Sequence, residues 1–153
     1  MGTRSSITLY EESVNGKGIY TGVYCHWDGY LSHNGEILLD KYNTANKVAE
    51  LISLGDMSSL GETPFPNPNK PHTFDESQKG VCVYYHRDRG ESWETTKPTI
   101  SDNEVEFYKS LKQEYNYLFR DGEWYWNDWS EENWKGGKPI WKLLTREDIS
   151  GDY

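Results

Sequence analysis

The sequence predicts a single α+β domain, in which two or three short helices pack on a mainly antiparallel sheet built from hairpins. Two hairpin signals, one near each end of the chain, predict the sheet, and apolar residues at helical spacing between them predict the helices. Domains most often contain about 100–150 residues, so residues 1–153 are expected to form one domain. Hairpins alternating with short helices are typical of the α+β class.

The first hairpin is expected near the amino terminus. Residues 4–10 are rich in β-forming side chains with alternating polarity, and residues 19–26 follow the same pattern. Residues 15–18 (Asn-Gly-Lys-Gly) between them favour a turn. We therefore expect two antiparallel strands joined by this turn.

Two helices and a loop are expected next. From Gly35 the apolar residues fall at helical spacing, and Thr44 is suited to cap a second helix that ends at Gly55. Residues 54–61 (LGDMSSLG) predict a short capped turn. Residues 61–72 hold four of the six prolines, which predicts a loop or lid with little regular structure.

The second half of the chain repeats this alternation. Residues 80–90 (GVCVYYHRDRG) predict a strand that ends in a charged turn. Ser101 and Glu104 are spaced as a capping box for a helix near 102–113. Residues 115–126 (YNYLFRDGEWYW), with Asp-Gly at the turn, give the clearest hairpin signal in the chain.

Tryptophans are concentrated near the carboxyl terminus. On the expected strand, Trp124 and Trp126 share one face of the sheet and Tyr125 lies on the other. Such a strand is either buried on both sides or part of an interface. Residues 139–145 (PIWKLLT) are expected to add a last strand.

The composition leaves two uses for the aromatic residues. The chain is 35% hydrophobic and 15% aromatic, with 7 Trp and 12 Tyr, so rings must supply much of the buried area. One interpretation is an aromatic core in a small β-rich domain. The other is that some rings stack on a planar ligand or a partner.

The formal net charge of −9 argues against direct DNA or RNA binding, which depends on Lys and Arg neutralising phosphates. The charge instead suits either solubility or mimicry of nucleic acid towards a basic protein surface. No run approaches the ~20 apolar residues of a membrane span, so no membrane association is expected. Cys25 and Cys82 lie in expected strands without a Cys-x-x-Cys pair, which predicts buried reduced thiols, with a disulfide between paired strands as the alternative.

The motifs for metal binding and catalysis are absent from the sequence. The four histidines, which are His26, His33, His72 and His86, form no His-Glu-x-x-His motif, and no paired Cys/His spacing occurs. There is no Gly-x-Ser-x-Gly elbow, and neither cysteine has a recognised catalytic context. We therefore predict no metal site, no cofactor and no enzymatic activity.

Basic residues suggest one anion site. His86, Arg87 and Arg89 stand at the end of an expected strand, where Arg87 and Arg89 would point the same way. Two guanidinium groups on one face can hold phosphate oxygens bidentately. The alternative is that Asp88, Glu91 and other acids neutralise them as surface ion pairs. Arg4 is the other candidate anion contact.

The segment His26-Trp27-Asp28-Gly29-Tyr30 sits where the second expected strand ends and the chain turns towards a helix. Asp28 and Gly29 favour a turn, so a structural corner is one interpretation. The other is a binding site in which Trp27 or Tyr30 stacks on a base and His26 bonds to it.

An ordered set of motifs resembles a family of small uncharacterised proteins encoded by bacteriophages and prophages. The set comprises Thr3-Arg4-Ser5, YCHWDGYLSHNGEILLDKY, LISLGDMSSLG, RDRGE and EYNYLFRDGEWYW, and it covers most of the chain. That family carries no firm biochemical assignment, so the resemblance implies an origin and not an activity.

The first third of the chain also resembles the amino-terminal part of the Thoeris anti-defence sponge proteins. Those phage proteins bind cyclic ADP-ribose-type and cyclic nucleotide signals in pockets at subunit interfaces. The resemblance carries over His26, Trp27, Asp28 and Tyr30 as a motif, of which His26, Trp27 and Tyr30 are the expected ligand contacts. Cys25 stands where such motifs often have a basic residue, and Leu31 stands where proline is frequent.

Together these observations predict a non-enzymatic phage protein of the host cytoplasm that sequesters a nucleotide-derived immune signal. The base would stack on Trp27, Tyr30 or a carboxyl-terminal Trp, and Arg4, Arg87 and Arg89 would hold the phosphates, in a pocket at a homo-oligomer interface. The alternative is an acidic inhibitor that covers a basic site on a host defence protein or nucleic-acid enzyme. The second alternative is an enzyme that degrades the signal.

Overall fold

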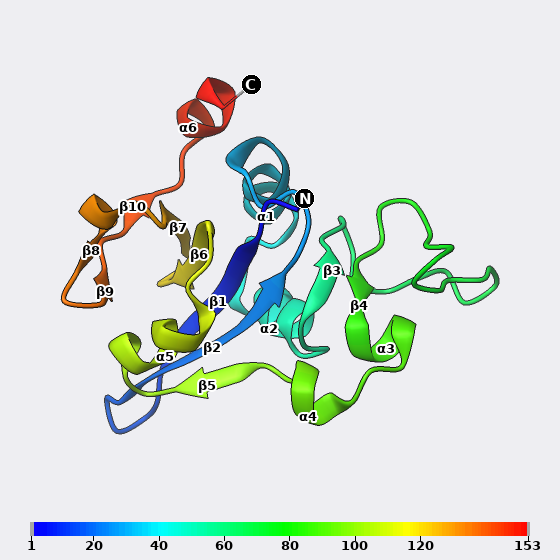
Figure 1. Cartoon of the computed structure of the whole chain (residues 1–153), viewed down its shortest axis with the longest axis horizontal. Coiled ribbons are helices and arrows are strands. Elements are labelled where there is room, and N and C mark those ends of the chain that lie inside the picture. The colour runs from blue at the N-terminus through cyan, green and yellow to red at the C-terminus, as the bar shows by residue number, and fades with distance from the viewer. Residues whose placement is uncertain (1, 153) are drawn as a thin grey trace.

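The computed structural model of the protein describes residues 2–152. An eight-stranded sheet forms its centre, with the order β10-β7-β6-β1-β2-β3-β4, and β5 also pairs with β2 (Figure 1). The strands are β1 (Ser5–Glu12), β2 (Gly18–Cys25), β3 (Met57–Ser59), β4 (Val83–Tyr84), β5 (Thr99–Ser101), β6 (Tyr115–Arg120), β7 (Glu123–Asp128) and β10 (Lys142–Leu143). A separate hairpin consists of β8 (Trp134–Lys135) and β9 (Lys138–Pro139).

The helical segments are short and more numerous than expected. They are the π-helical turn η1 (Leu31–Gly35), α1 (Glu36–Lys41), α2 (Ala45–Ile52), α3 (Tyr85–Arg89), α4 (Trp93–Thr96), α5 (Glu104–Leu111), the 3₁₀ turn η2 (Glu131–Asn133) and α6 (Arg146–Gly151). The α+β class is confirmed.

The prediction of a mainly antiparallel sheet is correct only in part, because the sheet is mixed. Both predicted hairpins are confirmed, since β1 pairs antiparallel with β2 and β6 pairs antiparallel with β7. However, β1 runs parallel to β6, and β2 runs parallel to β3. The helical segment between β2 and β3 returns the chain to the sheet in the same direction, which is how parallel neighbours are connected.

The helices before β3 follow the prediction closely. Thr44 caps α2 by accepting a hydrogen bond from the Lys47 N–H at 3.3 Å. The expected turn at residues 54–61 is wrong in part, because Met57–Ser59 forms β3 between β2 and β4. Residues 61–72 form a loop, as predicted.

The predicted strand over residues 80–90 is wrong beyond Tyr84. Only Val83–Tyr84 is a strand, and the chain then enters α3. The physical reason is local: the Asp88 carboxylate accepts a hydrogen bond from the Tyr84 N–H at 2.8 Å, and Gly90 ends the helix with φ of 78°. The basic residues of this segment therefore lie on a helix.

The helix expected near residues 102–113 forms as α5, but its predicted capping box does not. Asn103 is the N-cap and accepts from the Glu106 N–H at 3.0 Å. Ser101 instead accepts from the Asn103 N–H at 3.1 Å and belongs to β5.

The carboxyl-terminal region contains both a confirmed prediction and a correction. Asp121 and Gly122 both have positive φ, 53° and 80°, as the tight turn between β6 and β7 requires. The strand expected over residues 139–145 is reduced to the two-residue strand β10, and α6 follows it.

The two faces of the sheet are covered differently (Figure 1). One face packs on α1 and α2 around an aliphatic core that includes Ile7, Leu9 and Val23. On the other face, α5 and the β8–β9 hairpin cover only part of the sheet, and the smaller core there consists of Phe107, Tyr108 and Leu111 with partly buried Tyr and Trp rings. Trp124 and Trp126 both pack on the aliphatic side, so their predicted shared face is confirmed.

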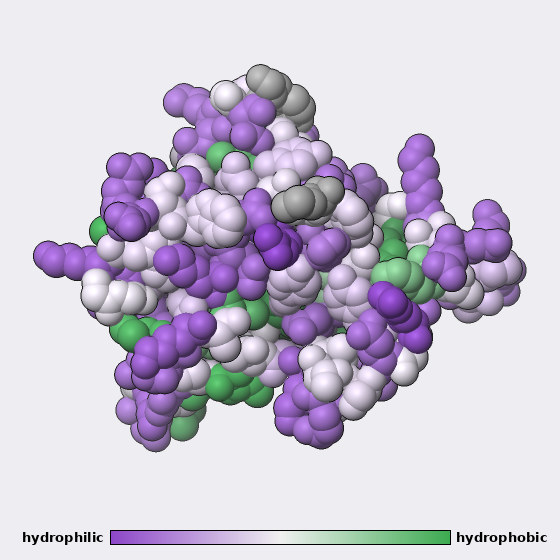
Figure 2. Space-filling view, in the orientation of Figure 1, coloured by the Kyte–Doolittle hydropathy of each residue, from purple (hydrophilic) through white to green (hydrophobic). Residues whose placement is uncertain are grey.

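The surface is mainly hydrophilic on the face shown in Figure 2, where hydrophobic residues form small separate patches. None of the helices within residues 2–152 is long and apolar enough to cross a lipid bilayer.

Candidate functional site

The corner at residues 26–30 has a structural role that its backbone contacts define. The Gly29 N–H donates to the Thr3 carbonyl at 2.8 Å, and the Gly29 carbonyl accepts from the Tyr117 hydroxyl at 2.6 Å. A Cβ on Gly29 would lie 2.8 Å from both the Thr3 oxygen and the Ser5 Cβ. The corner therefore holds the start of β1 against β6, and only glycine fits there.

Asp28 and Asn34 complete this corner. Asp28 has a positive φ of 56°, and its carbonyl accepts from the Asn34 N–H at 3.2 Å. The fully buried Asn34 amide donates to Ser5 Oγ at 3.2 Å and to the Trp27 carbonyl at 3.4 Å. The Tyr30 hydroxyl donates to the Asp28 carboxylate at 3.3 Å, and the charge of Asp28 raises the pKa of Tyr30. The polar groups of the corner are thus engaged with one another.

Arg4 precedes β1 and His26 follows β2, and Tyr24 interacts with both. The Tyr24 hydroxyl is 2.7 Å from His26 Nδ1. Burial raises the pKa of Tyr24, and the charge of Arg4 acts in the opposite direction. The Arg4 Nε lies 3.3 Å from the Glu114 carboxylate, so this candidate anion contact already has a counter-ion.

Trp27 is the most exposed ring of the corner, with 43% of its surface accessible. Its ring is nearly perpendicular to the His26 ring, with an interplanar angle of 89° and a centroid distance of 4.7 Å. Stacking of this exposed indole on a planar ligand stays a prediction.

Asp56 occupies a gap in the edge of β2. The neighbouring strands β5 and β3 pair with different parts of that edge, and the Asp56 carboxylate accepts the Tyr24 N–H between them at 2.9 Å. Burial raises the pKa of Asp56 to about 6, although the hydrogen bond from Tyr24 acts in the opposite direction. The Asp56 carboxylate thus accepts the Tyr24 N–H in place of a carbonyl from a neighbouring strand.

A cavity of about 350 Å³ borders the corner on the side of α1. Asp28 and His33 line one wall, and Glu62, Gln78 and Lys79 belong to the segments that line the other. It lies beyond the carboxyl ends of the parallel strands β2 and β3, which is where open sheets commonly bind ligands.

Arg87 fastens the proline-rich loop to α3. Its guanidinium group donates to the Asp88 carboxylate at 2.8 Å, to the Cys82 carbonyl at 3.0 Å and to the Pro64 carbonyl. Burial opposes ionisation of Asp88, but hydrogen bonds from Arg87 and from the Tyr84 N–H hold its pKa below the usual value. Arg87 thus makes structural contacts on several sides.

His72 and Gln78 extend this attachment along the loop. The buried His72 ring accepts from the Gln78 N–H at 3.0 Å through Nδ1, and its Nε2 lies 3.3 Å from Asp88. The Gln78 side-chain amide donates to the carbonyls of Asn67, Lys70 and Pro71. These side chains order the loop in place of regular secondary structure.

Arg89 and His86 do not join Arg87 in one anion site. Residues two apart on a helix point in different directions, so the predicted shared strand face of Arg87 and Arg89 is wrong. Arg89 lies over the Phe74 ring at 4.8 Å and within 3.7 Å of Glu91. His86 contacts the Glu91 carbonyl at 2.7 Å. Arg87 and Arg89 are therefore each in a local ion pair, which was the alternative interpretation of this basic segment.

The two cysteines are buried and free, which confirms the prediction of buried thiols. Burial raises the pKa of Cys25 to about 12 and also raises the pKa of Cys82. Within residues 2–152, no group of three or more His, Cys, Asp or Glu side chains is placed to hold a metal ion.

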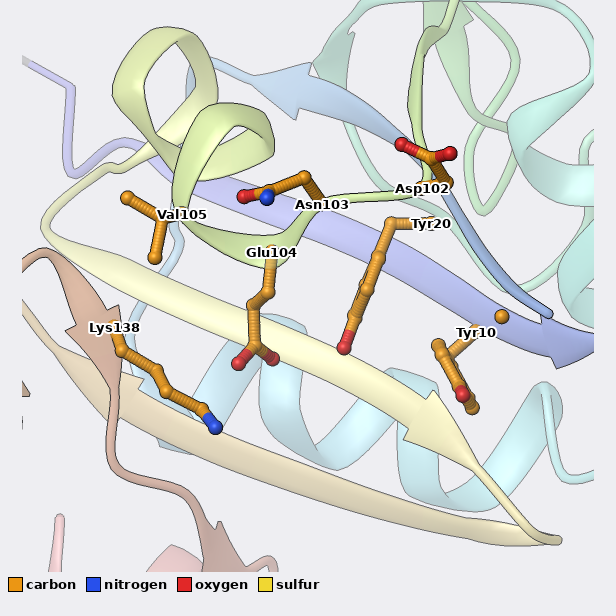
Figure 3. Close-up of a pocket in the computed structure, with 8 residues that line it drawn as sticks. Tyr10, Tyr20, Asp102, Asn103, Glu104, Val105 and Lys138 are labelled. Carbon is orange, nitrogen blue, oxygen red and sulfur yellow. The ribbon is translucent and has the colours of Figure 1, made fainter.

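A second cavity, of about 320 Å³, lies at the amino-terminal end of α5 (Figure 3). The Tyr10 and Tyr20 rings form one wall, with centroids 4.8 Å apart, and the Glu104 side chain points into the same space. Burial, then the charge and a hydrogen bond of Glu104, raise the pKa of Tyr20. The lining residues are Tyr10, Gly18, Tyr20, Asp102, Asn103, Glu104, Val105 and Lys138.

Two carboxylates, Asp102 and Glu104, line this cavity, and four others lie at the same end of the sheet, at the end of β1 and around the β6–β7 turn; we call these six the acidic edge. β1 and β6 run parallel, so Glu11 and Glu12 at the end of β1 lie near the turn after β6. Among residues 2–152, Asp102 is the single member within 4.0 Å of a cationic side chain, at 2.6 Å from Lys17 Nζ. The acidic edge consists of Glu11, Glu12, Asp102, Glu104, Asp121 and Glu123.

Local sequence patterns do not indicate this second cavity or its aromatic wall. Tyr10 and Tyr20 are cross-strand partners in the first hairpin, so their pairing follows from the register of β1 and β2. A predicted register would have found the tyrosine pair. Glu104 reaches it only because β5 pairs with β2, which no local pattern indicates.

No family model, no curated protein and no solved structure matches this chain.

Proposed function

We propose that the protein acts by binding, without catalysis, and that its partner is a protein with a basic surface. The observation that carries this proposal is the acidic edge, where five of six carboxylates have no cation within 4.0 Å among residues 2–152. The candidate phosphate contacts offer no comparable free charge, because Arg4, Arg87 and Arg89 each lie beside a carboxylate.

The chemistry of the acidic edge favours a basic protein over other partners. Carboxylates repel nucleic acid but attract the Lys- and Arg-rich surfaces that bind it. Such complementarity speeds the encounter and selects the partner, while nearby rings add buried contact area. The protein would inhibit its partner by covering a basic site, in the manner of a nucleic-acid mimic.

The test compares two variants with equal changes in charge. In the first, Glu11, Glu12, Asp121 and Glu123 are replaced by the matching amides. In the second, four exposed glutamates outside the acidic edge are replaced by Gln, namely Glu50, Glu131, Glu132 and Glu147. Because the resemblance to phage proteins suggests a bacterial host, each tagged variant is incubated with bacterial lysate and bound proteins are quantified.

We expect a stoichiometric partner to be retained by the wild type and the second variant, lost by the first variant, and released by rising salt. Equal retention by both variants would overturn the proposal. The captured protein must also be basic and lose its own nucleic-acid binding when the wild type is added.

Sequestration of a nucleotide-derived signal is the second candidate, and the cavity beside Asp28, His33 and Lys79 favours it. The exposed Trp27 ring lies on the same corner. Calorimetric titration with cyclic nucleotides and ADP-ribose isomers tests this candidate, and chromatography of the recovered ligand tests turnover. Binding that Trp27→Ala and Lys79→Gln weaken would support it, and the absence of binding by folded protein would exclude it.

A further inference from the structure

The cavity at the start of α5 contains a carboxylate that a neutral indole N–H holds in position. The Trp141 Nε1–H donates to Glu104 Oε2 at 3.1 Å, and the Tyr20 ring lines the same cavity. Glu104 is itself half-buried. Its side chain is thus fixed before any ligand arrives.

No cationic side chain within residues 2–152 forms an ion pair with this carboxylate. Lys17 at the rim pairs with Asp102 and not with Glu104. Lys138 extends towards the cavity from β9 (Figure 3), yet no cationic side chain within residues 2–152 lies within 4.0 Å of Glu104. A charge that is partly withdrawn from water and unpaired favours a cationic ligand.

The aromatic wall fits a cation of a particular shape. The Tyr10 and Tyr20 rings lie beside Glu104, and ring faces attract cations that are also partly desolvated. A guanidinium group is planar, is weakly hydrated, stacks on rings and bonds to carboxylates through more than one N–H. A lysine ammonium lacks this combination.

We propose that this cavity binds the guanidinium group of one arginine side chain presented by the partner, stacked on the tyrosine wall and bonded to Glu104. The inference rests on the proposed function, because it supplies the anchor residue of the basic partner. Arginine is among the residues that most often dominate the energy of a protein interface.

The test uses N-acetyl-L-arginine amide as the probe and the Trp141 indole N–H resonance as the readout. We expect the probe to bind weakly and to shift this resonance, because the indole donates to Glu104. The citrulline analogue, which has a similar shape without the charge, should produce no shift. The matching lysine derivative should bind at least about fivefold more weakly than the arginine probe.

Three variants locate the site. Glu104→Gln keeps an acceptor for Trp141 but removes the charge, and it should weaken the probe by about tenfold or more. Glu106→Gln is the matched control on the same helix, since Glu106 is exposed and pairs with Lys109, and it should leave binding unchanged. Lys138→Gln removes a competing cation from the rim and should strengthen binding.

The outcomes separate this inference from the proposed function. If the arginine probe causes no shift, if Glu104→Gln leaves its binding unchanged, or if the citrulline analogue shifts the Trp141 resonance equally, the arginine site is wrong. The variant that replaces Glu11, Glu12, Asp121 and Glu123 then tests the proposed function independently, because it leaves Glu104 intact. If the arginine probe binds and the acidic-edge variants keep the partner, the cavity is an arginine site but the proposed partner is wrong.

Discussion

The two faces of the central sheet divide the protein into a structural side and a chemical side. The face towards α1 and α2 is closed by aliphatic residues such as Leu38 and Leu51, which are fully buried. The face towards α5 exposes hydroxyl, imidazole and carboxyl groups, and α5 covers only part of it. Side chains alternate along β1 between these two faces. Ile7 and Leu9 point towards α1 and α2, whereas Thr8 and Tyr10 point towards the face with α5.

This difference indicates which face of the sheet can carry functional groups. A face that supplies most of the stability tolerates little change, because its atoms are close-packed. The polar face contributes less to stability and is free to carry binding groups. Asp102 and Glu104 of the acidic edge and the partly buried Tyr24–His26 pair lie on that second face or at its margin.

The largest loss of stability is expected from a substitution in the closed face towards α1 and α2. Leu51→Ala should lower the free energy of unfolding by about 3–5 kcal/mol, because a buried cavity replaces the side chain. Leu111→Ala on the other face should cost about 2–3 kcal/mol, because the partly buried Trp134 and Trp141 rings can move into the space. Urea unfolding of both variants measures the difference. A greater loss for Leu111→Ala would contradict the division between the faces.

An intermediate loss of stability is expected from a substitution in the corner at residues 26–30. This substitution tests whether the corner has a structural role. Gly29→Ala places a Cβ 2.8 Å from backbone and side-chain atoms, so it should cost about 1–3 kcal/mol of stability. Gly151→Ala is the matched control, because nothing lies within 4 Å of the added Cβ. Thermal unfolding compares the two. An unchanged midpoint for Gly29→Ala would mean that the corner does not hold β1 in place.

The smallest expected effect concerns Asp56 on the polar side. Its native pKa of about 6 lies above the ordinary value of 3.8, so the native state binds the proton more tightly than the unfolded state. This contribution to stability is fully present below the ordinary pKa and is lost as the pH rises through about 6. Relative to Asp56→Asn, the wild type should therefore lose about 1–2 kcal/mol over that range, after allowance for solvent screening.

Unfolding of both proteins across this pH range measures the difference directly. Asp56→Asn keeps an acceptor for the Tyr24 N–H, whereas Asp56→Ala removes it and should be destabilised at every pH. Parallel pH profiles for the wild type and Asp56→Asn would show that Asp56 does not titrate as proposed.

The sequence predicts those parts of the fold that depend on neighbouring residues. The turn at Asp121 and Gly122 and the cap at Thr44 are local signals, and both elements form as expected. β3 was missed because a three-residue strand is defined by its partners β2 and β4 and not by its own pattern. α3 was missed because the bond from the Tyr84 N–H to Asp88 competes with a continued strand.

The candidate site shows the same limit. Trp27 is exposed, and its role as a ligand contact stays a prediction. Arg87 holds the proline-rich loop, because its partner Pro64 comes from a distant segment that no local pattern connects to it. The pairing of Tyr10 with Tyr20 was accessible through the hairpin register. Their meeting with Glu104 depends on tertiary contacts between β2, β5 and α5, which local sequence patterns do not encode.

The loop held by Arg87, His72 and Gln78 offers a practical point of attachment. Its order depends on a few side chains, and residues 67–70 at its tip are exposed. Pro68 and Asn69 lie between carbonyls that Gln78 secures, so a peptide tag or a dye placed there should leave the anchors in place. The acidic edge and the cavity at α5 draw on other segments of the chain, so such a label can report on binding without entering the surface under test.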